Sequence, residues 1–279
     1  MEVKIYQKEN KLSLFKLLKE SLHDIYSSRF LARQLAERDI KAQYRQSYFG
    51  ILWAFLTPLV TAFVWIILNK TGTIKLTDAG MPYPLFAFSG TLMWSIITDS
   101  INSPLTSTNG ARAILTKINF PKEALIVSGI YKLLFNTAIK LMLLIIFIIY
   151  FNVAFTWYLV LIPFVVLGAV LFGTTIGLFI TPIGLLYGDV NKLIAFALKF
   201  LMYVTPVVYV IPKAGIMKTL MELNPMSSII LTVRELILGV EFNSILPMLI
   251  ILLCCIPLVF LGLIIYRISI PIIVERLSA

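Results

Sequence analysis

The sequence predicts an all-α polytopic membrane protein with six transmembrane helices, N-terminal interfacial helices and an outer re-entrant helical hairpin between helices 5 and 6. The 279-residue chain is 59% hydrophobic and 14% charged, whereas a soluble domain is about 45–50% apolar and about 25% charged. Its apolar residues lie in long blocks, and a helix needs about 20 of them to cross a bilayer. Lipid-exposed strands or loops would leave backbone amides unsatisfied, so these blocks are expected to be helical.

Residues 1–48 are predicted to form a cytoplasmic segment with amphipathic interfacial helices. The first 28 residues carry many charges and no apolar stretch typical of a signal peptide. Apolar side chains of residues 11–22 fall on one side of a helix, which predicts a helix on the membrane surface. The alternative is a short helix packed on a soluble partner.

A second helix is predicted over residues 29–47, with a basic face. Arg38, Lys41 and Arg45 share this face because they are spaced at i, i+3 and i+7. Two interpretations are open: an ordinary positive-inside anchor, or a collar that meets an anionic lipid head group. The helix either continues into the first span or bends at Gly50 before it.

Residues 49–267 are predicted to form the membrane domain, followed by a cytoplasmic tail over 268–279. With the N-terminus inside, six spans return the C-terminus to the same side, where most Lys and Arg residues then lie. The predicted spans are 49–69, 84–105, 124–150, 158–181, 193–211 and 245–266.

Two connections are predicted to be structured. The basic loop 106–123 contains a short helix from about Ala111 to Lys117, which either docks another protein or simply connects two spans. The segment 212–244 is long for a bare loop and is predicted to be a hairpin of two short helices, re-entrant or lying on the surface. Its second helix begins with Asn224 as the cap and Pro225, and ends at Gly239.

Several residues within the spans carry further expectations. Gly173 and Gly177 form a GxxxG pattern, which favours close helix packing. Pro206 should kink or break the fifth span. Charged residues in a membrane usually face an interior or a cavity. Asp99 has two candidate partners, Lys140 and Lys199, while Lys132 either snorkels or faces a cavity.

Aromatic residues of the first and fifth spans suggest a conduit, because sugars stack on aromatic rings. Plain core packing explains each ring taken singly equally well. The residues predicted to line this conduit are Trp53, Phe55, Tyr203, Thr205, Pro206 and Tyr209.

Motifs of catalysis and cofactor binding are missing from the sequence. It has no GxxxxGK[ST] phosphate loop, no HExxH and no GxSxG, and its single histidine is His23. Cys254 and Cys255 are adjacent and show neither metal-ligand spacing nor a disulfide framework. No catalytic, cofactor or metal site and no nucleic-acid partner is therefore expected.

Five motifs follow one another between about Arg38 and Gly239. They are RDIKAQYRQSYFGILWAFLTPL, PYPLFAFSGTLMWS, LTKINFPKEAL, YGDV with YVTPVVY, and NPMSSIILTVRELILG. In this order they resemble the permease subunit of type-2 ABC exporters for O-antigen, capsule or teichoic acid polymers.

The resemblance implies a homodimer in the bacterial cytoplasmic (inner) membrane that works with two copies of an ATP-binding cassette subunit, which hold ATP and Mg. The substrate would be a glycan on polyprenyl diphosphate or a similar lipid, met by Arg38, Lys41 and Arg45. In LYGDV, many relatives have an Arg before the Asp, so the role of this turn is left open. The resemblance also implies a coupling helix with Asn109, Arg112, Leu115, Lys117 and Phe120, and an outer gate with Asn224, Pro225 and Arg234.

Three other functions remain open. A drug or lipid exporter of the same superfamily would use the same architecture, with a pocket in place of a continuous passage. A membrane-embedded glycosyltransferase or flippase, acting alone on a glycan, would need no ATPase. The third is a structural membrane anchor, which the ordered motifs disfavour.

Overall fold

The computed structural model describes residues 14–45, 47–72, 80–115, 117–118, 120–240 and 242–278. Within these ranges the chain is helical, with connecting turns and no strand. The elements are α1 (Leu14–Ser27), α2 (Arg29–Arg45), α3 (Leu52–Lys70), α4 (Tyr83–Gly110), α5 (Arg112–Leu115), α6 (Glu123–Tyr150), η1 (Trp157–Leu161), α7 (Ile162–Leu186), α8 (Gly188–Tyr203), α9 (Ile216–Leu223), α10 (Pro225–Leu238) and α11 (Ile245–Ser278).

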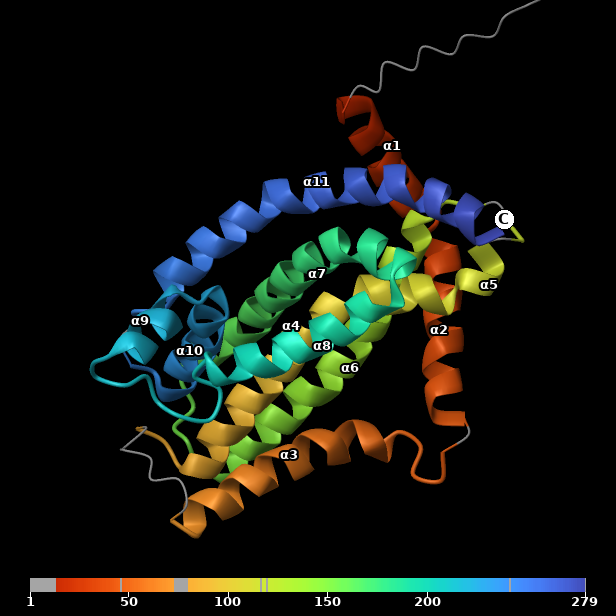
Figure 1. Cartoon of the computed structure of the whole chain (residues 1–279). Coiled ribbons are helices and arrows are strands. Elements are labelled where there is room, and N and C mark those ends of the chain that lie inside the picture. The colour runs from red at the N-terminus through yellow and green to blue at the C-terminus, as the bar shows by residue number, and fades with distance from the viewer. Residues whose placement is uncertain are drawn as a thin grey trace, which may run out of the picture.

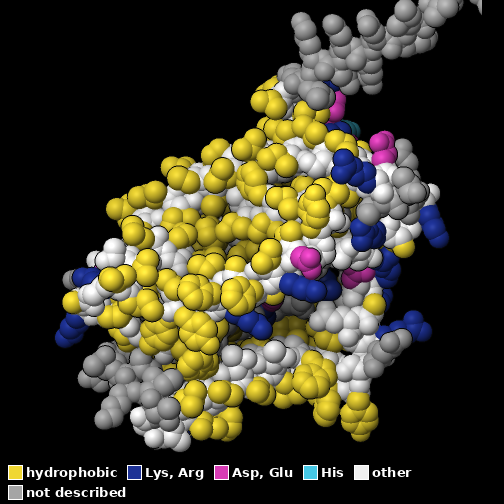
Figure 2. All heavy atoms as spheres, in the orientation of Figure 1, with side chains coloured by type: hydrophobic (Ala, Val, Ile, Leu, Met, Phe, Trp, Pro, Cys, Tyr) yellow, Lys and Arg dark blue, Asp and Glu magenta, His cyan; other side chains and the backbone are white. Residues whose placement is uncertain are grey.

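Long helices form a bundle with distinct ends (Figure 1). The first, which we call the N-terminal end, carries α1, α2, α5 and the C-terminus. The opposite end carries α9 and α10, and we call it the hairpin end. Hydrophobic side chains cover most of the face seen in Figure 2, with Lys and Arg gathered mainly toward the N-terminal end. This distribution suits a bundle surrounded by lipid.

Helix α4 lies at the centre of the bundle and packs closely on α7. A Cβ added at Gly173 would overlap the Ser100 side chain, and one at Gly177 would overlap the carbonyl oxygen of Ile101. The absence of side chains at these two positions therefore lets the two backbones approach each other. The close packing predicted from the GxxxG pattern is confirmed.

Four helices among the described residues are long and apolar enough to cross a membrane, which supports a multi-pass membrane protein. They are α3, α6, Trp157–Leu186 and Ile245–Arg276. Two of the six predicted spans do not meet this standard. Helix α8 has only 16 residues, and α4 carries a row of polar side chains that lowers its hydropathy. Length and composition therefore do not confirm the count of six spans.

The N-terminal helices differ from prediction mainly at their ends. Helix α1 runs on to Ser27 rather than stopping at residue 22, and residues 11–13 lie outside the described residues. Helix α2 ends at Arg45, and Gly50 adopts a left-handed φ of 48°. The chain therefore bends before the first span instead of continuing into it, and glycine adopts this conformation without steric cost.

The fifth predicted span, 193–211, is wrong at both ends because α8 covers Gly188–Tyr203. The predicted break near Pro206 is confirmed, since the helix stops three residues earlier. The Thr205 hydroxyl donates to the Leu201 carbonyl at 2.7 Å and satisfies one acceptor of the last turn.

The two short helices predicted between α8 and α11 are confirmed, and so are the residues predicted at both ends of α10. Asn224 accepts a hydrogen bond from the Met226 amide at 3.0 Å, and Pro225 is the first residue of α10. Gly239 ends α10 in the left-handed conformation, with φ of 65°. Whether the hairpin is re-entrant stays a prediction.

The loop helix is shorter than predicted. It covers Arg112–Leu115, while α4 extends to Gly110 and takes in the residues expected to precede the loop helix. The reason lies in tertiary contacts: Thr108 is fully buried and its hydroxyl lies 2.9 Å from the Tyr266 hydroxyl. This contact with α11 holds the last turns of α4 in place.

Candidate functional site

One face of α4 is polar along most of its length. Its members are spaced by three or four residues, which places them on the same side of a helix. They are Thr91, Ser95, Asp99, Asn102, Ser103, Thr106 and Ser107. Polar side chains in an apolar bundle are costly and usually face a cavity. The spacing was available in the sequence but was not recognised as a continuous row.

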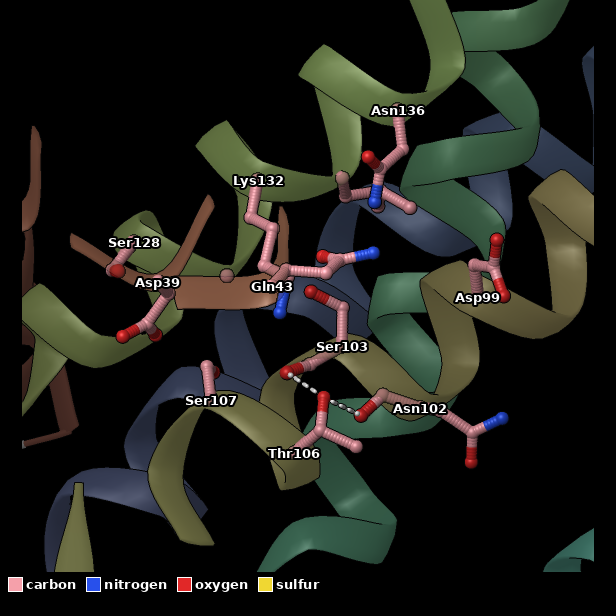
Figure 3. Close-up of a pocket in the computed structure, with 12 residues that line it drawn as sticks. Asp39, Gln43, Asp99, Asn102, Ser103, Thr106, Ser107, Ser128, Lys132 and Asn136 are labelled. Carbon is pink, nitrogen blue, oxygen red and sulfur yellow. Dashed lines mark hydrogen bonds between the residues drawn. The ribbon is translucent and has the colours of Figure 1, made fainter. Parts of the chain in front are cut away.

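Polar residues of α6 and α2 face the same row. Ser128, Lys132, Asn136 and Lys140 follow one another at four-residue steps along α6, and α2 contributes Asp39 and Gln43. Figure 3 shows these side chains, apart from that of Lys140, converging from α2, α4 and α6. Three helices thus present their polar faces to one space.

The space consists of two adjoining cavities. The first, which we call the α2 cavity, measures about 390 Å³ and is lined by residues of α2, α4 and α6. The second, the α3 cavity, measures about 430 Å³ and lies against α3. Gln43, Asp99 and Asn136 line both, so the cavities adjoin. Together we call them the polar track.

An ion pair lies where the cavities meet. Lys140 Nζ is 2.5 Å from Asp99 Oδ2 and 2.5 Å from Ser95 Oγ. Lys140 is 7% exposed, so pairing offsets the cost of burying its charge. The structure thus selects Lys140 over the exposed Lys199 as the partner of Asp99.

The basic face of α2 lies outside the polar track, since none of its three residues lines either cavity. Arg38, Lys41 and Arg45 are exposed, and Arg38 pairs with Asp39 at 2.8 Å. Lys41 and Arg45 line an open depression of about 500 Å³, which we call the α2 depression. Its other lining residues are Ile40, Tyr44, Ile51 and Phe135.

Tyr44 connects the depression to the polar track. It lines both the α2 depression and the α3 cavity, and its hydroxyl is 3.4 Å from Asn136 Oδ1. Burial raises the pKa of Tyr44, so the hydroxyl keeps its proton at neutral pH. A molecule with an apolar part and a polar part would find both environments on the two sides of this ring.

The predicted conduit residues do not lie together within the single chain. Trp53 lines the α3 cavity, whereas Phe55 packs against the core. Tyr203 is exposed, and its carbonyl accepts from the Tyr209 hydroxyl. Thr205 and Pro206 are buried in the connection after α8. The conduit stays a prediction for an assembly of more than one chain.

The predicted coupling residues lie in α5 or in the segments that flank it. Asn109, Arg112 and Lys117 are exposed, while Leu115 is buried against Leu125 and Ala111. Phe120 lines a cavity of about 460 Å³ at the N-terminal end. Lys122 in the same wall has a pKa lowered by burial. The role of these residues in coupling to a partner stays a prediction.

Arg267 at this cavity was missed by the sequence interpretation. It bonds Glu20 and Asp24 of α1 at 3.3 and 2.7 Å, and Glu123 of α6 at 2.6 Å. Ser21 also donates to Glu123, at 2.9 Å. Since these partners are 144 to 247 positions away in the chain, no local pattern pointed to them.

The predicted gate residue Arg234 is a buried anchor. It is 4% exposed and donates to the backbone carbonyls of Phe86, Pro206 and Val207. Its guanidinium carbon lies 3.5 Å from the centre of the Phe86 ring. Arg234 therefore ties α10 to α4 and to the segment that follows α8.

A second polar bridge strengthens the same junction. Asn224, the cap of α10, donates to Thr205 Oγ1 at 2.8 Å and to the Val204 carbonyl at 3.2 Å. The hairpin is therefore fixed to the end of α8 by side chains at both ends of α10.

Within the described part of the chain, no group of three or more His, Cys, Asp or Glu residues is placed to hold a metal ion. The polar track instead offers hydroxyl, amide and paired charged groups inside an apolar bundle. Such an arrangement is suited to binding or guiding a polar molecule.

Comparison with known proteins gives one family. Residues 31–238 match the family described as ABC-2 type transporter. A protein of Myxococcus xanthus named "O-antigen export system permease protein RfbA" is 28% identical over 211 residues, covering 75% of this chain and 80% of that protein. Two Klebsiella pneumoniae proteins of the same name are 26% and 24% identical, over 76% and 75% of this chain and 83% and 80% of theirs.

Proposed function

We propose that this chain, which belongs to the ABC-2 type transporter family, is the membrane subunit of an ATP-driven exporter that moves a lipid-linked polysaccharide. The family assigns a transport permease. The similar proteins named for O-antigen export support a glycan as its cargo. The single observation that carries the proposal is the polar track, because an apolar helix bundle has no structural need for it.

The chemistry of a lipid-linked glycan fits the features around α2. Exposed Arg38, Lys41 and Arg45 suit the anionic diphosphate, each cation near an anionic surface contributing about 1 kcal/mol. The apolar residues of the α2 depression suit the lipid. The hydroxyl and amide groups of the polar track suit the sugars.

ATP would be hydrolysed by two copies of a separate ATP-binding cassette subunit, since this sequence has no phosphate loop. These subunits would hold ATP and Mg and dock at the N-terminal end, on the surface formed by Asn109, Arg112 and Lys117. The N-terminal end would then lie in the cytoplasm of a bacterium, with the hairpin end outside and six helices across the cytoplasmic membrane.

A homodimer would complete the passage. Apolar side chains of α3 and α8 are exposed, among them Phe63, Phe196 and Phe200 at 60%, 71% and 65%. Two copies joined along these helices would bring Trp53 and Tyr203 of each chain to a shared passage, closed outside by the α9–α10 hairpin.

Reconstitution tests the proposal. The chain is purified with its ATP-binding subunit and placed in vesicles, and ATP-dependent movement of lipid-linked glycan from the source cells is measured. We expect movement with ATP and none when the ATP-binding subunit is omitted. Equal movement without that subunit would instead identify a flippase, and equal movement of a lipid without sugar would identify a lipid exporter.

The head-group role is tested in the same vesicles. Replacing Arg38, Lys41 and Arg45 together with Gln should reduce glycan movement while assembly with the ATP-binding subunit persists. Unchanged movement at equal protein content would exclude these cations from head-group binding.

A further inference from the structure

The α2 cavity has the properties of a built binding site. Its volume of about 390 Å³ lies within the range of about 300–1,000 Å³ typical of small-molecule sites. Most lining groups are polar, and they come from three helices rather than one (Figure 3). The buried Ser103 and Ser128 are 8% and 3% exposed, so their hydroxyls lie inside the protein rather than on its surface.

The charges of the α2 cavity nearly cancel. Asp39 is paired with Arg38, and Asp99 with Lys140. Among the described residues, Lys132 is the one cation in the lining itself, and it forms no ion pair at 4.0 Å or less. A doubly charged phosphate would meet two carboxylates in this lining and only one unpaired cation.

The lining offers hydrogen-bond donors and acceptors in similar measure. The amides of Gln43, Asn102 and Asn136 each carry both functions, and so do the hydroxyls of Ser103 and Ser128. Thr106 and Ser107 donate to backbone carbonyls of α4 and therefore present acceptors, as the two carboxylates do. Sugar hydroxyls also donate and accept, whereas a phosphate mainly accepts. The lining therefore favours an uncharged sugar over a phosphate.

The surroundings determine which sugar of a lipid-linked glycan would be held. The α2 depression, with its apolar side chains and the cations Lys41 and Arg45, lies across Tyr44 from the polar track. A lipid in the depression would place its diphosphate near these cations. The sugar attached to that diphosphate would then enter the α3 cavity first and reach its junction with the α2 cavity, which Gln43 and Asn136 line.

We propose that the α2 cavity is a sugar-binding site, which holds the uncharged sugar unit next to the diphosphate of the carrier lipid. Gln43 and Asn136 supply amide groups at its junction with the α3 cavity, and Lys132 donates to sugar oxygens. The inference rests on the proposed function. It adds that each chain binds the sugar in its own cavity before the glycan enters the passage between the two copies.

Matched leucine variants test the site in the complex with the ATP-binding subunit. Gln43→Leu and Asn136→Leu remove lining amides with little change in volume. Gln34→Leu is the control, because Gln34 is an exposed amide on α2 that lines neither cavity. Binding is measured for two probes: lipid-linked glycan extracted from the source cells, and undecaprenyl diphosphate without sugar.

We expect the wild-type complex to bind the lipid-linked glycan more tightly than undecaprenyl diphosphate. Gln43→Leu and Asn136→Leu should each weaken glycan binding by about threefold to tenfold, the effect of one lost hydrogen bond. Binding of undecaprenyl diphosphate should be unchanged in both variants, which also shows that they are folded. Gln34→Leu should bind both probes as the wild type does.

Three other outcomes would overturn the inference in distinguishable ways. Equal weakening of both probes would make the cavity a phosphate site. If neither variant weakened the binding of either probe, the cavity would hold water and not sugar, and the proposed function would still stand. If the wild-type complex bound neither probe, this result would contradict the proposed function itself and, with it, the sugar site.

Discussion

Two arginines hold opposite ends of the helix bundle, and they use different partners. At the hairpin end, Arg234 is buried, donates to three backbone carbonyls and lies over the Phe86 ring. At the N-terminal end, Arg267 has a side chain 23% exposed and pairs with three carboxylates from α1 and α6. The hydrogen-bond acceptors of Arg234 are backbone carbonyls, whereas those of Arg267 are side-chain carboxylates on two other helices.

This difference indicates which end is built to move. The hydrogen bonds from Arg234 to the carbonyls of the connection after α8 cannot break unless the backbone of that connection rearranges. Carboxylates of α1 can exchange partners with water or with a docking protein, because exposed ion pairs contribute little individually. We therefore expect a rigid hairpin end and an adjustable N-terminal end, where α1, α6 and α11 meet.

The largest effect is expected from Arg234→Leu. Three buried carbonyls would lose a charged donor, and we expect unfolding in detergent to become easier by about 4 kcal/mol or more. Arg234→Lys should be intermediate, because an ammonium group cannot reach all three carbonyls. The measurement is the free energy of unfolding in detergent. An unchanged value for Arg234→Leu would show that the junction does not depend on this residue.

Gly90→Ala should have the next largest effect at the same end. A Cβ at this position would overlap the Val207 carbonyl oxygen and the Arg234 guanidinium. Overpacking of this kind costs about 1–3 kcal/mol, and displacement of Arg234 would add to it. Gly110→Ala is the matched control, since a Cβ there has nothing within 4 Å. Equal stability of the two variants would contradict the tight junction.

Arg267→Met should cost less, about 1–2 kcal/mol, because water reaches part of this network. The loss should come mainly from Glu123, which is 3% exposed and would keep an uncompensated charge. Adding Glu123→Gln should therefore recover part of the stability. If the double variant loses the sum of the two single effects, the two residues are not coupled.

Ser21→Ala should have the smallest effect, about 1 kcal/mol for one buried hydrogen bond. Its hydroxyl donates to Glu123 from a fully buried position on α1. Ser27→Ala is the control on the same helix, because Ser27 is exposed. We expect protease cleavage near α1 to accelerate for Ser21→Ala and not for Ser27→Ala. The reverse order would place the anchor of α1 elsewhere.

Local features of the fold were predictable from sequence. Asn224, Pro225 and Gly239 predicted both ends of α10, because capping depends on a few neighbouring residues. The row of polar side chains on α4 could also be predicted from the sequence, since Asp99, Asn102 and Thr106 repeat with helical spacing.

Long-range partners were not predictable in this way. The choice of Lys140 over Lys199 for Asp99 depends on how α4 packs on α6. The networks of Arg234 and Arg267 depend on segments far apart in the chain, which only the folded structure brings together.

The most direct test of the account is whether the polar track holds water and sugar. With Cys254 and Cys255 replaced by Ala, N136C places a thiol in the track, and I145C places one on the exposed apolar face of the same helix. A charged, hydrophilic thiol reagent should label N136C much faster than I145C, because thiolates form in water and not in lipid. Lipid-linked glycan should slow the labelling of N136C. Equal, slow labelling of both positions, or no protection by the glycan, would contradict the polar track as the route of the substrate.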